Sequence, residues 1–100
     1  MSELDRRFVA VIRLLDDGEV VSYGDIAEDA GFPGRSRAVG RLLATTDEDL
    51  PWWRVVNSVG RLVPGQEAEQ ARVLRSEGVT VRNGRVVLAP HGRFSRPTTP

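Results

Sequence analysis

Two short segments of the chain hold the residues whose types and spacing could do chemistry. Residues 35–41, Arg-Ser-Arg-Ala-Val-Gly-Arg, contain three arginines and no acid, and Pro51-Trp52-Trp53-Arg54 contains both tryptophans of the protein. Arginine makes forked contacts with phosphates and stacks on flat ring systems, while an indole face is a stacking surface for an unpaired base. Both segments are therefore candidates for contact with nucleic acid.

The arginine segment is predicted to be helical from about Arg35 to Ala44. Its apolar residues share one face of a helical wheel, and the opposite face carries Arg37, Gly40, Arg41 and Ala44. Glycine inside a helix costs roughly 1 kcal/mol relative to alanine, but it lets the backbone approach something narrow and negative, such as the DNA minor groove. A solvated basic face with a tolerated glycine explains the same pattern, so both interpretations remain open.

The two tryptophans are adjacent, so in an extended segment their side chains cannot point the same way. One is expected to pack inward while the other meets solvent or a ligand; the alternative is that both anchor the core of a small domain. Tyr23 could donate a hydrogen bond from its hydroxyl to a phosphate or be a half-buried packing residue. Arg54 could bond loop carbonyls.

Composition argues for binding rather than catalysis. The chain has 100 residues, no cysteine and one histidine, His91, so thiol nucleophiles, thiolate metal sites and a serine–histidine triad lack their parts. No cofactor is expected. The formal net charge is zero, which opposes a nucleic-acid role, but all basic residues are arginine and they are unevenly distributed along the chain.

The pattern of apolar residues and turn signals predicts one mostly α-helical domain over residues 1–88. Helices are expected near residues 2–18, 22–30, 35–44 and 65–77, the second and third joined by a glycine turn as in a helix-turn-helix. Asn83-Gly84 predicts a hairpin between residues 79–82 and 85–88. Residues 89–100, rich in proline, are expected to be disordered. Without a membrane span or secretory pattern, the protein is expected to be soluble and cytoplasmic.

Taken together, these segments resemble the C-terminal domain of O6-alkylguanine-DNA alkyltransferases, from roughly Phe8 to Leu88. Val20-Val21-Ser22-Tyr23-Gly24-Asp25-Ile26-Ala27 is similar to the start of that family's tyrosine-bearing helix. Ser36-Arg37-Ala38-Val39-Gly40 resembles its recognition helix with the arginine finger, and Pro51-Trp52-Trp53-Arg54-Val55-Val56 resembles its Pro-Cys-His-Arg-Val-Val motif. The resemblance implies a small winged helix-turn-helix-like domain with a short β-hairpin.

The departures from the family motif concern its reactive centre. Trp52 stands where the resemblance places the alkyl-accepting cysteine, and Trp53 stands at the position of the histidine that activates it. Glu77 matches the family's glutamate that supports the histidine. Because Trp53 replaces the histidine, Glu77 is expected to lack its partner. Pro64-Gly65 lies about where the family has a Tyr-Ser element that closes its pocket. Replacement of the cysteine, commonly by tryptophan, is the pattern of alkyltransferase-like proteins, so no methyltransferase activity is expected.

The resemblance implies a monomer that binds double-stranded DNA containing O6-alkylguanine in the minor groove, flips the nucleotide and recruits nucleotide excision repair proteins. DNA contacts are expected from Tyr23, Arg35, Arg37, Gly40 and Arg41, and a lesion pocket from Trp52, Trp53, Arg54, Val55, Asn57 and Ser58. The alternative is a sequence-specific transcriptional regulator, reading the major groove as a dimer through the same helix-turn-helix.

Overall fold

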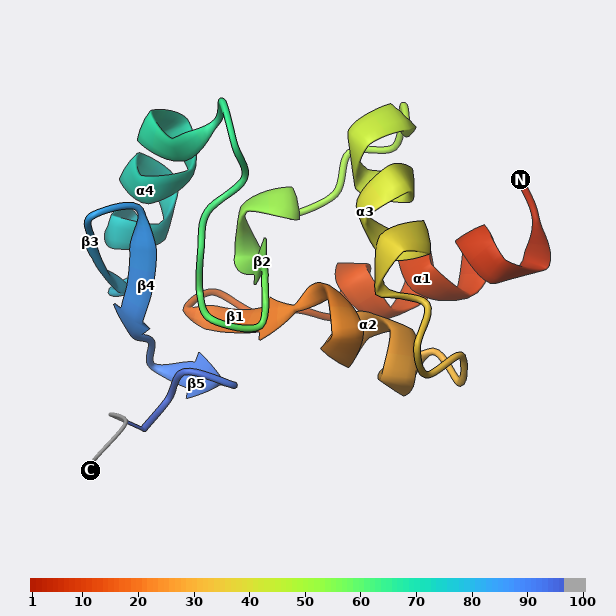
Figure 1. Cartoon of the computed structure of the whole chain (residues 1–100), viewed down its shortest axis with the longest axis horizontal. Coiled ribbons are helices and arrows are strands. Elements are labelled where there is room, and N and C mark those ends of the chain that lie inside the picture. Colours follow the sequence, from red (N-terminus) through yellow and green to blue (C-terminus); the bar gives the residue numbers. More distant parts are fainter. Residues whose placement is uncertain (97–100) are drawn as a thin grey trace.

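The computed structural model describes residues 1–96 and builds them from four α-helices and five short strands (Figure 1). In chain order these elements and one 3₁₀ turn are α1 (Glu3–Arg13), β1 (Glu19–Ser22), α2 (Tyr23–Asp29), α3 (Ser36–Thr45), η1 (Trp52–Arg54), β2 (Val55–Val56), α4 (Glu67–Ser76), β3 (Thr80–Arg82), β4 (Arg85–Leu88) and β5 (His91–Gly92).

The first half is a helical unit whose ends follow the sequence signals. The Ser2 side chain accepts a hydrogen bond from the Asp5 amide at the start of α1. Ser22 and Asp25 form a reciprocal capping box at the start of α2, which fixes Tyr23 as the first helical residue. Helices α2 and α3 pack closely on either side of the predicted glycine turn and against α1. The core between the three helices includes Phe8, Ile12, Ile26, Val39 and Leu42.

The second half packs α4 against the β3–β4 hairpin. Asn83 and Gly84 both have positive φ, 52° and 73°, as the two central residues of the predicted tight turn require. A second apolar cluster, separate from the first, is buried here and comprises Val20, Val56, Leu62, Ala71, Leu74, Val79, Val81, Val86 and Ala89. The mostly helical architecture and the hairpin predicted from the sequence are confirmed.

A small parallel sheet joins the two halves. Strand β1 lies in the centre, with Val21 and Ser22 paired with Val55 and Val56 of β2 and with β5 on the other edge (Figure 1). This long-range pairing is not among the elements predicted from the sequence. Parallel pairing between distant segments leaves no local turn signal.

The expectation that the chain is disordered from residue 89 is wrong for residues 89–96. Ala89 is buried, Phe94 packs on the second apolar cluster, and β5 pairs with β1. Gly92, at φ +87°, permits this pairing, because a Cβ there would lie 2.5 Å from the Val20 carbonyl oxygen. The proline-rich composition of this segment does not indicate a strand, because β5 is stabilised by pairing with the distant strand β1. The remainder of the predicted tail, residues 97–100, lies outside the described residues.

Within residues 1–96, no helix combines the length and apolar character that crossing a membrane requires.

Candidate nucleic-acid interface

The exposed face of α3 carries arginines that no carboxylate neutralises. Arg35 caps the helix, and Arg35, Arg37 and Arg41 are all exposed. Among the described residues, none of the three lies within ion-pairing distance of an acid. They surround a hollow of about 510 Å³ between α3 and the start of α1. The face is therefore a localised positive surface in a chain of zero net charge.

Gly40 is half-buried on the same helix and faces the ring of Tyr23. A Cβ added at Gly40 would lie 4.0 Å from the Tyr23 Cδ1 and Cε1 atoms, an ordinary van der Waals contact. The internal packing of the protein would therefore accept an alanine. Since glycine weakens a helix, its presence here is explained better by an external partner that needs the backbone close than by the fold itself.

A pocket of about 430 Å³ opens beside Gly40, between α3 and the loop that leads into α4. In Figure 1 these two segments stand on either side of the green η1 turn that carries Trp52. The pocket is lined by Tyr23, Gly40, Leu43, Ala44, Trp52, Val63, Pro64 and Gln66. Its volume lies in the range of small-molecule sites, and its apolar walls with one indole suit a flat aromatic ring such as a nucleobase.

Tyr23 links the pocket to the surface of α3. Burial raises the pKa of the Tyr23 hydroxyl above its ordinary value of 10.0. The phenol therefore keeps its proton at neutral pH and can donate a hydrogen bond, for example to a phosphate oxygen.

Trp52 and Trp53 point to different environments, as predicted, although the backbone here is a 3₁₀ turn and not an extended strand. Trp52 lines the pocket, while Trp53 packs on the second apolar cluster. The two indoles meet edge to face, with ring centroids 6.2 Å apart and an interplanar angle of 83°. Trp53 is thus the inward residue, and it supports Trp52 from behind.

Glu77 has a partner, contrary to the expectation from the sequence. The Trp53 indole N–H donates to Glu77 Oε2 at 2.8 Å, so the indole supplies the hydrogen bond that the resemblance assigns to the histidine of the family motif. Arg54 donates to both Glu77 oxygens, at 3.0 and 2.8 Å, and the Gly18 amide donates at 2.9 Å. One carboxylate therefore ties the start of β1, the η1 turn and the end of α4 together.

This network is electrostatically balanced. Burial alone would raise the pKa of Glu77, but hydrogen bonds from Arg54, the Gly18 amide and Trp53 hold it below the ordinary value. The hydrogen bond from Arg54 to Glu77 raises the pKa of Arg54, which also donates to the Leu15 carbonyl and to Asp17. Arg54 is a buried structural residue.

Five of the six residues predicted to form a lesion pocket do not line the pocket beside Gly40. Trp53 and Arg54 belong to the Glu77 network, and Val55 is fully buried in the first apolar cluster. Asn57 accepts hydrogen bonds from the Val59 and Arg61 amides and closes a turn, and Ser58 lines a different hollow. The parallel pairing of β2 with β1 carries residues 55–58 away from Trp52.

The remaining wall of the pocket comes from Val63, Pro64 and Gln66. Of these only Pro64 had been placed near the pocket, through the family's Tyr-Ser element. The loop is held by Gln70, which is fully buried although polar. Its Oε1 accepts from the Val63 amide at 2.7 Å, and its Nε2 donates to the Trp53 and Val55 carbonyls. A glutamine on the inward face of the predicted helix, beside Ala71 and Leu74, was the signal that could have revealed this loop.

The fold and the arrangement of this site agree with a known family. The sequence profile described as the DNA-binding domain of 6-O-methylguanine DNA methyltransferase matches residues 3–79. The chain belongs to this family.

Two relatives are covered over most of their own length by the chain. A DNA base-flipping protein of Vibrio parahaemolyticus is 40% identical over 84 residues, covering 79% of this chain and 84% of the relative. The crystal structure of S. pombe Atl1 in complex with damaged DNA containing O6-carboxymethylguanine superposes with a TM-score of 0.73 at 30% identity, over 82% of each chain.

The enzyme branch of the family has the same fold. The structure of Mycobacterium tuberculosis OGT in complex with DNA matches with a TM-score of 0.69 at 28% identity, covering 77% of this chain and half, 50%, of that longer chain. The resemblance inferred from the sequence and the small alkyltransferase-like fold are therefore confirmed.

Proposed function

We propose that this protein recognises DNA carrying O6-alkylguanine and leaves the lesion chemically unchanged. The observation that carries the proposal is the position of Trp52. Its indole forms a wall of the pocket beside α3, in a member of an alkyltransferase family whose sequence contains no cysteine to accept an alkyl group. A pocket of this kind can hold an alkylated base by stacking but cannot dealkylate it.

In this proposal α3 lies in the minor groove, and Gly40 lets its backbone approach the floor of the groove. Arg37 enters the base stack and fills the space left by the flipped nucleotide, whose unstacking costs a few kcal/mol and least for a weakened pair. Tyr23 contacts the neighbouring phosphate at the mouth of the pocket. Arg35 and Arg41 contact phosphates and set the position of the protein without reading sequence.

Because the proposed complex does not repair the lesion, other proteins must remove it. We propose that the monomeric protein, bound to the flipped base in the cytoplasm, marks the site for nucleotide excision repair. The names of the relatives support base flipping and binding to damaged DNA, the first two steps of this proposal.

The deciding experiment is a titration of matched DNA duplexes that differ only in one O6-methylguanine, with mass spectrometry of protein and DNA afterwards. We expect tighter binding to the alkylated duplex, independent of the surrounding sequence, and no mass change in either molecule. Preference for one base sequence without preference for the lesion would favour the transcriptional regulator. A protein that gains the mass of a methyl group would establish an enzyme.

The role of Arg37 has a separate test with a control on the same helix. Arg37→Ala should weaken binding mainly to the alkylated duplex. Arg41→Ala should weaken both duplexes about equally and reduce the salt dependence by about one ion. Equal loss in both variants would assign Arg37 to phosphate contact only.

A further inference from the structure

Most of the arginines that form no ion pair within residues 1–96 lie at two separate places; Arg75, which donates to the Val81 carbonyl, lies at neither. Many of the arginines form ion pairs, for example Arg13 with Glu48, Arg72 with Glu69 and Arg93 with Asp25. Among residues 1–96, the arginines that form no ion pair include two groups. One is the α3 group described above, and the other lies around the β3–β4 hairpin and consists of Arg61, Arg82, Arg85 and Arg96.

The second group lines a hollow of about 870 Å³, the hairpin groove. It is bounded by the turn that precedes Arg61, by β3 and β4, and by the chain around Phe94. Within the part of the chain that the structure describes, no carboxylate lines this groove. Arg93 also borders it, but its guanidinium is engaged by Asp25 at 2.7 and 2.8 Å. The groove is therefore strongly positive.

Exposed apolar side chains lie between these arginines. Val59, Val87 and Leu88 are 50%, 44% and 38% exposed, and all three line the groove. Arg85 donates to the Val59 carbonyl and so holds the turn against β4. Nothing in the packing of the domain requires these apolar side chains at the surface.

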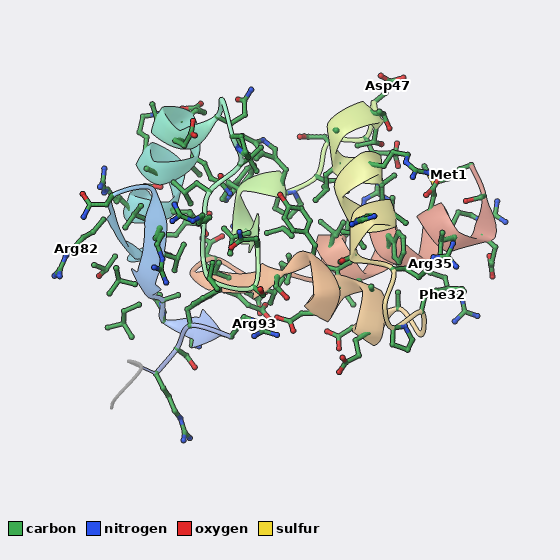
Figure 2. All side chains as sticks on the ribbon, viewed as in Figure 1. Met1, Phe32, Arg35, Asp47, Arg82 and Arg93 are labelled. Atoms are coloured by element: carbon green, nitrogen blue, oxygen red, sulfur yellow. The ribbon has the colours of Figure 1, made fainter. Side chains whose placement is uncertain are left out.

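The hairpin groove lies far from α3. Figure 2 shows Arg82 at the end of the molecule opposite Arg35, and the molecule extends 38 Å along its longest axis. No residue lines both the groove and the Trp52 pocket. A partner in the groove would not compete with a ligand on α3.

We propose that the hairpin groove binds an acidic protein segment in which Asp or Glu residues are mixed with apolar side chains. The charge of the groove requires a negative partner. Its apolar residues separate a protein from DNA, because protein interfaces combine arginine with buried apolar groups, whereas contacts to the DNA backbone are made to charged phosphates and sugars. The proposal does not depend on lesion binding, since the two surfaces share no residue.

The test measures fluorescence anisotropy of a short labelled peptide in which Asp and Glu alternate with Leu and Ser, titrated with the full chain. Two control peptides replace either the acids by lysine or the leucines by serine. We expect the first peptide to bind, more weakly at high salt, the lysine peptide not to bind, and the serine peptide to bind less tightly.

Charge reversal locates the site. Arg61→Glu and Arg82→Glu, whose side chains make no ion pair with the described residues, should each weaken the peptide roughly tenfold, because repulsion replaces attraction. Arg72→Glu changes the charge equally on exposed α4 outside the groove and should have little effect. Val87→Ser should weaken the peptide while leaving the melting temperature unchanged.

Three results would overturn the proposal. These are equal loss with Arg72→Glu, equal binding of the leucine and serine peptides, or loss of affinity for unmodified duplex DNA in Arg61→Glu and Arg82→Glu, which would make the groove a second DNA surface. DNA titrations of the same variants keep the two proposals apart. If lesion binding fails while the peptide binds, only the proposed function is refuted.

Discussion

The two faces of the Trp52–Arg54 turn differ in how completely their polar groups are satisfied. On one face, the closed face, three side-chain hydrogen bonds join Trp53, Arg54 and Glu77, and the Gly18 amide adds a fourth to Glu77. On the other face, Trp52 contributes only an indole wall to a pocket open to solvent. Three consecutive residues thus serve a rigid support and a binding surface.

The closed face, formed by Trp53, Arg54 and Glu77, supports the open face, formed by Trp52. A flipped base can be held only if the wall it stacks on does not move, and Trp52 is backed edge to face by Trp53. Trp53 is in turn fixed by Glu77. In the proposed complex, rigidity on the closed face is therefore a condition for binding on the open face. Variants that act on one face alone test this dependence.

The largest effect is expected for Glu77→Ala. Its removal leaves Arg54 buried with only Asp17 and the Leu15 carbonyl, and breaking a buried ion pair costs about 3–5 kcal/mol. Chemical denaturation should show this loss in the free energy of unfolding. Glu69→Ala, which removes an exposed ion pair on the same helix, is the control and should unfold like the unmodified protein. Equal stability of the two variants would mean that the closed face supports nothing.

The next effect separates the two indoles. Trp53→Ala should destabilise the domain by about 3 kcal/mol, since it opens a cavity in the second cluster and removes a donor to Glu77. Trp52→Ala should lower the melting temperature much less but reduce the affinity for alkylated DNA by about 1–3 kcal/mol, the contribution of stacking on one base. If Trp52→Ala melts like Trp53→Ala, or keeps its full preference for alkylated DNA, Trp52 is a core residue.

The open face was easier to predict from the sequence than its support. Tyr23, Gly40 and Trp52 were all placed at the site because helix periodicity, capping signals and the family motif are local. Val55, Asn57 and Ser58 do not line the pocket beside Trp52, since β2 pairs with a strand more than thirty residues earlier. No local pattern encodes that register.

The closed face was missed for a different reason. The family motif predicts Glu77 at this place, but the replacement of the histidine by Trp53 predicts that Glu77 has lost its partner. An indole N–H is a donor like a protonated ring nitrogen of histidine, so the hydrogen bond survives while acid–base chemistry does not. Likewise, Gln70 at an inward position indicates a buried polar anchor. Its partners, the Val63 amide and the Trp53 and Val55 carbonyls, lie in other segments.

A smaller effect, of opposite sign on the two properties, is expected for Gly40→Ala. The pocket side of α3 accepts the extra Cβ at 4.0 Å from Tyr23, so the helix should gain up to about 1 kcal/mol in stability. The same methyl group would stand between the backbone and DNA and should weaken binding to alkylated and unmodified duplexes alike. Ala68→Ser, at an exposed position of α4 that lines neither the pocket nor the α3 face, is the control. A stabilised variant with unchanged DNA affinity would show that Gly40 is only tolerated.

The smallest effect concerns pH and tests the closed face alone. Because the folded-state pKa of Glu77 is below its ordinary value of 4.5, its stabilising contribution is complete above that value and is lost as the pH falls through the lower folded-state pKa. Burial opposes the hydrogen bonds, so the net contribution should be modest. The pKa of Asp25 is also lowered, chiefly by its hydrogen bond from Arg93, so protonation of Asp25 at low pH should reduce the stability as well. Denaturation at a series of pH values from neutral to below 4.5 should show a decline that is shallower in Glu77→Gln, which cannot titrate. An identical decline in both proteins would assign it to Asp25 and other acids and would leave the Glu77 network electrostatically neutral.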